Sequence, residues 1–171
     1  MIIIDGYNFI HTIRGLEHRM PIDQIDSARA ELHEQLSRFH NITREQVRVV
    51  YDARGGKPLP PEELPGVAVV YAPANVSADD YIVRSLRNAN HPARITVVTS
   101  DRELGERVKD AGARVMKASA FHHKMIDAFE KGDARDEKAG EKPGRPSAEE
   151  IDFFMDVFSD DTRRRGPNEK I

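Results

Sequence analysis

Residues 1–8 read MIIIDGYN, so a run of branched apolar residues stops abruptly at an aspartate and a glycine. Because Met1–Ile4 is too apolar to leave one face in water, it predicts a central strand that is covered on both faces. Further apolar runs predict strands over residues 46–51, 67–71, 94–99 and 113–116. Strands that are buried on both faces are typical of a parallel sheet.

Helical periodicity separates these strands. Apolar residues at spacings of three and four predict helices over residues 22–39, 77–90 and 103–111, and another from residue 119. Ser77 is expected to cap the second helix, and Ser100 with Glu103, at capping-box spacing, the third. The alternation predicts an α/β fold of three layers, with a central, mostly parallel sheet and helices on both faces.

The segments between and after these elements differ in composition. A polar stretch follows Asp5, and residues 53–66 predict an irregular loop because they are rich in glycine and proline. We therefore place the domain at residues 1–131 and a linker, rich in charge, glycine and proline, at 132–146. Residues 147–171 are expected to form an apolar helix and a tail, and the helix either packs on the domain or binds a partner.

Composition excludes several classes of protein. The chain has 171 residues and no cysteine, so a disulfide framework and a thiolate zinc site are ruled out. Its net charge of -3 argues against binding of nucleic acid through bulk positive charge. No apolar run reaches membrane-spanning length, and Met1–Ile4 leads straight into Asp5. We therefore expect a cytoplasmic protein with no signal peptide and no membrane partner.

Aspartates stand where the predicted strands end or the predicted helices begin, at Asp5, Asp52, Asp79 and Asp101. In an open parallel sheet those points share one edge, so the carboxylates can converge in one crevice. The plainer interpretation is local: Asp5 and Asn8 could close a turn, and Asp79, Asp80 and Asp101 could stabilise helix starts. The repeated placement at one edge favours a shared site.

Clustered carboxylates repel one another, and near neutral pH they need protons or cations to neutralise them. Hard cations such as Mg2+ and Mn2+ prefer oxygen ligands and keep several waters, so few carboxylates suffice. A structural zinc site is disfavoured without cysteine or a histidine cluster. Because divalent ions activate water and stabilise charge on phosphoryl oxygens, hydrolysis of a phosphodiester is the natural use of such a site.

Four motifs, in this order and at these spacings, resemble the YacP-like NYN domain, a family of PIN-like, metal-dependent ribonucleases of bacteria: DGYN at 5–8, YDA at 51–53, SAD at 77–79 and TSD at 99–101. The resemblance covers most of residues 1–131 and includes a C-terminal extension with a late helix. It implies an endoribonuclease that acts on RNA with Mg2+ or Mn2+. Some bacterial members are linked to messenger RNA on ribosomes, so both are implied as partners.

Carried over by position, the resemblance implies that Asp5, Asp79 and Asp101 hold the metal. It also implies a catalytic role for Asn8, whose amide oxygen would take part directly or orient a metal-bound water. Asp52 and Asp80 rank second, because the first can hold a turn or an outer-shell water and the second can simply support a helix start.

Local positive charge predicts where RNA phosphates would bind. Arg54, Lys57 and Arg102 flank the acidic motifs and could rim the crevice, although ordinary solvated surface is the plainer interpretation. Tyr7 could stack on an unpaired base, although a core position is the plainer interpretation for it. The mildly acidic chain favours a substrate that is presented to it over strong autonomous RNA binding.

Two other functions stay open at this point. The first is a catalytically inactive module of the same fold that binds RNA or the ribosome. The second is a phosphoacceptor receiver domain, which also clusters aspartates at strand ends. The receiver is disfavoured because its acidic pair directly follows the first strand, whereas Asp5 is followed by Gly6, Tyr7 and Asn8.

Overall fold

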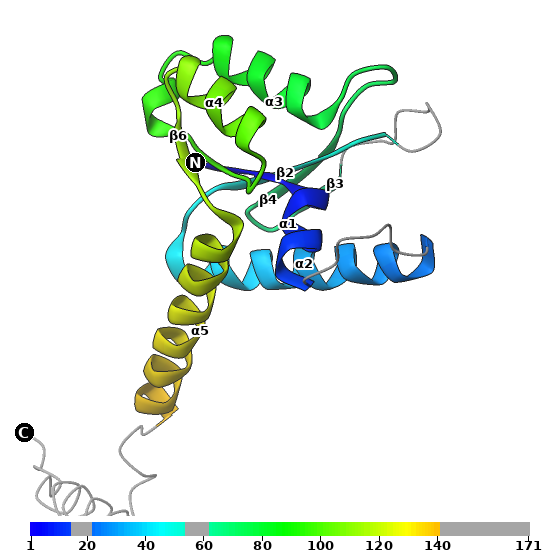
Figure 1. Ribbon diagram of the computed structural model, residues 1–171. Helices are drawn as coiled ribbons and strands as arrows, with labels where there is room; N and C mark the ends of the chain where they lie inside the picture. Colours follow the sequence, from blue (N-terminus) through cyan, green and yellow to red (C-terminus); the bar gives the residue numbers. More distant parts are fainter. Residues whose placement is uncertain (15–21, 54–61, 141–171) are drawn as a thin grey trace, which may run out of the picture. The chain divides into compact units, whose positions relative to one another are not determined.

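The computed structural model describes residues 1–14, 22–53 and 62–140. Their centre is a six-stranded sheet with the strand order β3-β4-β2-β1-β5-β6 (Figure 1). The strands are β1 (Ile2–Asp5), β2 (Val47–Tyr51), β3 (Glu62–Leu64), β4 (Val67–Tyr71), β5 (Thr96–Val98) and β6 (Arg114–Met116). All pairings are parallel except that of β3 with β4 at one edge. The predicted mostly parallel α/β sheet is confirmed.

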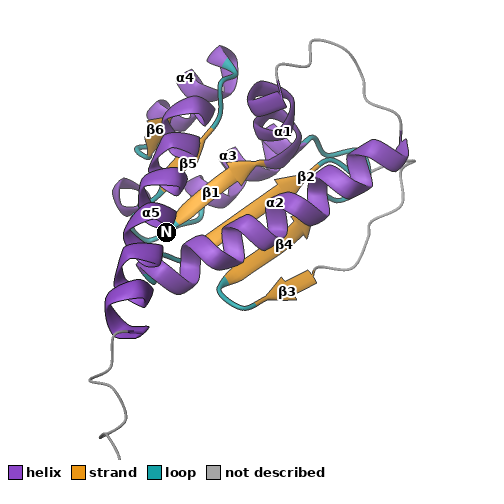
Figure 2. Cartoon of the chain, turned by 90° about the horizontal axis from the view of Figure 1, so that it is seen from below, coloured by secondary structure: helices purple, strands orange, loops and turns teal. Residues whose placement is uncertain are grey.

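The sheet has helices on both faces, as predicted. They are α1 (Gly6–Arg14), α2 (Ile22–Thr43), α3 (Ala78–Arg87), α4 (Arg102–Asp110) and α5 (Ala118–Gly140). Ile2 and Ile4 contribute to a core with α1, α2 and α5, whereas Ile3 belongs to a second core with α3 and α4. Figure 2 shows α2 lying over β2 and β4 and running roughly along them. Because successive residues of β1 point into two different cores, positions 2, 3 and 4 must all carry apolar side chains.

The first strand lies in the middle of the sheet, as its composition predicted. Ile4 pairs with Val49 of β2 on one side and with Val98 of β5 on the other. Asp5 is the last residue of β1, so its carboxylate stands at the carboxyl edge of the sheet. This edge is where open α/β proteins place their ligands.

One helix was not predicted, and one prediction of an irregular segment is wrong. The polar stretch after Asp5 begins with helix α1, whose Phe9 and Ile10 are buried in the core. The predicted loop over residues 53–66 contains strand β3, which a two-residue turn at Pro65 and Gly66 joins to β4. Gly66 has a φ of 72°, the conformation that favours glycine in the second central position of such a turn. The Pro-Gly dipeptide was the available signal.

The start of α4 also differs from its prediction. Asp101, not Ser100, is the N-cap, and its Oδ1 accepts a hydrogen bond from the Leu104 amide at 2.9 Å. Serine and aspartate are equally good caps, so the sequence could not decide which of these two neighbouring residues would be the N-cap. The prediction for α3 is confirmed, because the Ser77 hydroxyl accepts a hydrogen bond from the Asp80 amide at 3.1 Å.

Helix α5 continues to Gly140, into the segment predicted as a linker from residue 132. The helix formers alanine, arginine, glutamate and lysine dominate the stretch after Gly132, which accounts for the difference. Met1–Gly132 forms one compact unit, and Asp133–Ile171 is separated from it. The predicted C-terminal helix and tail at 147–171 lie outside the described residues. Within the described part of the chain, no helix is long and apolar enough to cross a membrane.

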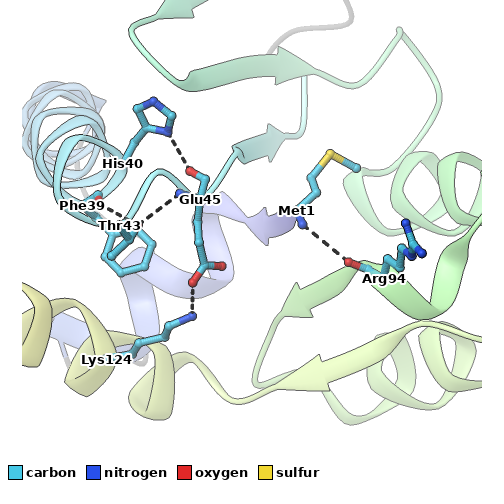
Figure 3. Close-up of polar contacts among 7 residues, drawn as sticks. All are labelled: Met1, Phe39, His40, Thr43, Glu45, Arg94 and Lys124. Atoms are coloured by element: carbon cyan, nitrogen blue, oxygen red, sulfur yellow. Dashed lines mark hydrogen bonds and ion pairs between the residues drawn. The ribbon is translucent and has the colours of Figure 1, made fainter.

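The amino edge of the sheet is held together by polar contacts (Figure 3). His40 Nδ1 lies 2.7 Å from the Glu45 carbonyl oxygen, and the Lys124 ammonium forms an ion pair with the Glu45 carboxylate. The N-terminal ammonium of Met1 donates to the Arg94 carbonyl at 3.5 Å. These contacts connect the end of α2, the approach to β2 and helix α5, so this edge has a structural role.

Gly6 provides a stability prediction at the junction of β1 and α1. A Cβ at this position would lie 2.6 Å from Cδ1 of Tyr51, whose side chain is fully buried. We expect Gly6→Ala to lower the free energy of unfolding by about 3 kcal/mol, because a packed aromatic ring must move. Gly105→Ala is the matched control, since its Cβ would meet only Val115 at 3.7 Å. Urea unfolding should show that Gly105→Ala is neutral or stabilising, and equal stability of the two variants would contradict this packing.

Candidate functional site at the carboxyl edge of the sheet

Asp5 is a buried carboxylate, only 8% exposed, at the end of the central strand. Burial chiefly, then the negative charges of Asp79, Asp52 and Asp101, raise the pKa of Asp5 to about 7. The backbone amide of Asn8 donates a long hydrogen bond of 3.4 Å to Asp5 Oδ1, and this bond opposes the rise in pKa. The four aspartates predicted from strand and helix ends therefore do lie near one another.

Asp79, in the first turn of α3, is half-buried. Burial first, and then the charges of Asp101 and Asp52, raise its pKa above the ordinary value, whereas the nearby Arg107 guanidinium lowers it. Because Ser77 caps the helix, Asp79 is not needed for that purpose. Asp5 directly precedes α1 and accepts only the long bond from the Asn8 backbone amide in the first turn of that helix. Among the described residues, Asp79 is the carboxylate of this site whose side chain holds no helix start in place.

Asp52 and Asp101 each hold the beginning of a helix. Asp52 Oδ1 accepts a hydrogen bond from the Ala78 amide at 2.6 Å, and Asp101 caps α4 through Leu104. The local interpretation of Asp101 is thus correct as far as it goes. Both side chains are exposed, and a carboxylate has a second oxygen, so a cap can also contribute charge to the site.

Asn8, in the first turn of α1, connects that helix to the segment between β5 and α4. Its Oδ1 accepts a hydrogen bond from the Ser100 amide at 2.8 Å, although the two residues are far apart in the sequence. Asn8 therefore fixes the segment that leads from β5 into α4, which carries Asp101. This contact was not predicted, because only the parallel pairing of β1 with β5 brings the two segments together.

Asp80 lies outside the buried part of the site and pairs with Arg107 of α4. This ion pair connects α3 to α4 and brings a positive charge beside Asp79. Sequence reasoning missed Arg107. The sequence contained no local signal for it, because its partner lies on another helix.

The structure describes two of the four predicted substrate-binding residues, Arg102 and Tyr7. Arg54 and Lys57 lie outside the described residues. Arg102 is 92% exposed and pairs with Glu106 on its own helix at 3.0 Å. Tyr7 is half-buried and packs against Tyr51 with ring centroids 4.8 Å apart, so the plainer, core interpretation describes its contacts. Its stacking on a base stays a prediction.

The donor set suits a hard cation. In residues 1–14, 22–53 and 62–140, no three histidine, aspartate or glutamate side chains stand close enough to hold an ion jointly. Mg2+ keeps several waters and often takes only one or two carboxylates. Asp5 and Asp79 supply such a pair, and the negative charge of Asp79 raises the pKa of Asp5. The residues present fit a hydrated divalent ion.

Removing the Asp5 charge should change how stability depends on pH. The folded-state pKa of about 7 lies above the unfolded value, so the metal-free wild type loses stability as pH rises from about 4 to above 7. Asp5→Asn has no such loss. We expect it to exceed the wild type by up to about 4 kcal/mol at pH 8 and to match it near pH 4. Thermal unfolding in EDTA measures this difference, and a pH-independent difference would contradict the burial of a charged Asp5.

Comparison with known proteins identifies what the chain is similar to. The family model of the YacP-like NYN domain matches residues 2–154. A crystal structure of Rae1 (YacP) from Bacillus subtilis has a TM-score of 0.68 and 24% sequence identity, covering 97% of this chain and 95% of that chain. A mutant of the same Bacillus subtilis protein gives a TM-score of 0.68 and 22% identity, covering 84% and 85% of the two chains. No curated protein matches the chain.

Proposed function

Since the chain belongs to the YacP-like NYN domain family, which has a PIN-like nuclease fold, we propose that it is a metal-dependent endoribonuclease that hydrolyses RNA phosphodiester bonds. The observation that carries the proposal is the pair Asp5 and Asp79. Both have raised pKa values and both lie at the carboxyl edge of the sheet. Asp79 holds no helix start, and Asp5 meets the start of α1 only through the long bond from the Asn8 backbone amide. Carboxylates that are not explained by stability are candidates for function.

The residues of the site have two proposed roles, metal binding and positioning. Asp5 and Asp79 would hold Mg2+ or Mn2+, which when bound polarises a phosphoryl oxygen and stabilises the charge that develops during hydrolysis, and Asp101 would add its negative charge to the site. Asn8 fixes the segment that carries Asp101 through its bond to Ser100. Asp52 fixes the start of α3 through Ala78, and so the position of Asp79.

RNA is the proposed substrate and messenger RNA its proposed source. The net charge of -3 supports a substrate that is delivered to the site, with the ribosome as the candidate that presents it. Arg102, together with Arg54 and Lys57, is proposed to bind phosphates at the rim. Single-stranded segments are the expected targets, because their bases are already unstacked.

Incubation of the protein with a messenger RNA, in Mg2+ and with or without ribosomes, tests the proposal. Cleavage supports the nuclease, and faster cleavage with ribosomes supports presentation. A folded protein that binds this RNA or the ribosome and leaves the RNA intact would instead be the inactive binding module.

A further inference from the structure

The ion pair of Asp80 with Arg107 borders the acidic site on the face of the sheet that α3 and α4 cover. Asp80 Oδ1 accepts a hydrogen bond from Arg107 Nη2, and these side chains are 55% and 34% exposed. The two helices lie beside each other on that face (Figure 1). Asp80 directly follows Asp79 in α3, and the guanidinium that Asp80 binds lies close enough to Asp79 for its positive charge to lower the pKa of that carboxylate.

Other positive charges nearby are placed differently. Arg102 extends into solvent and pairs within α4, and Arg84 acts on Asp80. Among the described cations, Arg107 is the one whose charge lowers the pKa of Asp79, so it is electrostatically coupled to the site. The acidic site repels any phosphate that approaches it, and a fixed guanidinium at its border opposes that repulsion.

We propose that Arg107 binds a non-bridging oxygen of the RNA phosphate at the acidic site, and that Asp80 is the positioning residue that holds the guanidinium there. This inference rests on the proposed function. A guanidinium has five N–H donors in a planar fork, so its bond to Asp80 leaves donors for a phosphate. The partial exposure of Arg107 gives a phosphate access to them.

The test compares Arg107→Gln, Arg107→Lys and Asp80→Asn with the wild type on short single-stranded RNA. Lys109→Gln is the matched control, because Lys109 is an exposed cation of the same helix. We expect Arg107→Gln to raise KM about tenfold with a smaller change in kcat, and to reduce the slope of RNA affinity against salt by about 1. Arg107→Lys should have a KM between those of the wild type and Arg107→Gln. Asp80→Asn should raise KM less than Arg107→Gln does, and Lys109→Gln should leave KM unchanged.

A purely structural tie between α3 and α4 makes a different prediction. Asp80→Asn and Arg107→Gln would then lower the melting temperature equally and change KM equally, which would overturn the inference. So would an unchanged KM in Arg107→Gln. Failure of the wild type to cleave would instead overturn the proposed function. Fluorescence anisotropy with labelled RNA still decides the role of Arg107 in that case, because unchanged affinity in Arg107→Gln rejects it.

Discussion

Replacing Asp79 with asparagine is expected to reduce RNA cleavage about a thousandfold or more while the protein stays folded. The loss corresponds to about 4 kcal/mol of transition-state stabilisation, within the range that a metal ion supplies. The fold should be retained or slightly stabilised, because burial, and then the charges of Asp101 and Asp52, raise the pKa of Asp79, and both costs disappear with its negative charge. Initial rates on single-stranded RNA, with circular dichroism of each variant, measure both effects.

Asp127→Asn is the matched control, because Asp127 is an exposed aspartate of α5, which packs on the other face of the sheet. It should cleave like the wild type. Asp101→Asn should lose activity and keep its helix cap, since asparagine caps as well as aspartate does. A double Asp5→Asn, Asp79→Asn variant should be no slower than either single variant, because the carboxylates act as a unit. Wild-type turnover by a folded Asp79→Asn protein would remove Asp79 from the mechanism.

Removal of divalent ions should have an effect of similar size. EDTA is expected to abolish cleavage, and excess Mg2+ or Mn2+ should restore it. The same ions should raise the melting temperature more at pH 8 than at pH 5, because protons compete for a carboxylate whose pKa is about 7. Asp5→Asn should show little of this shift. Cleavage that persists in EDTA, or an equal shift at both pH values, would contradict a metal held by these carboxylates.

The sequence predicted the sheet well because burial dictates composition. Ile2, Ile3 and Ile4 face two cores in alternation, so each of them had to be apolar. The convergence of the aspartates followed from the parallel topology alone. Helix α1 was missed because it begins at Gly6, without a spacer after the strand, so that its capping residue, Asp5, is also the last residue of β1. Strand β3 was missed because Glu62–Leu64 has no apolar alternation.

Features of the site that depend on distant partners could not be predicted. The bond from Ser100 to Asn8 and the pair of Asp80 with Arg107 each join segments that only the fold brings together. The burial that raises the pKa of Asp5 likewise comes from the surrounding elements. Local caps are a different case, since Ser100 and Asp101 were both plausible and geometry chose the second.

The ends of the RNA fragments test the central claim most directly. Hydrolysis supported by a metal at Asp5 and Asp79 uses water as the nucleophile, so the products should carry 5′-phosphate and 3′-hydroxyl groups. Enzymatic end-labelling and mass spectrometry of the fragments from the wild-type protein in Mg2+ or Mn2+ distinguish the possibilities. We expect 5′-phosphate and 3′-hydroxyl ends throughout. Fragments with 2′,3′-cyclic phosphates would show attack by the ribose hydroxyl of the RNA itself and would contradict metal-dependent hydrolysis at this site.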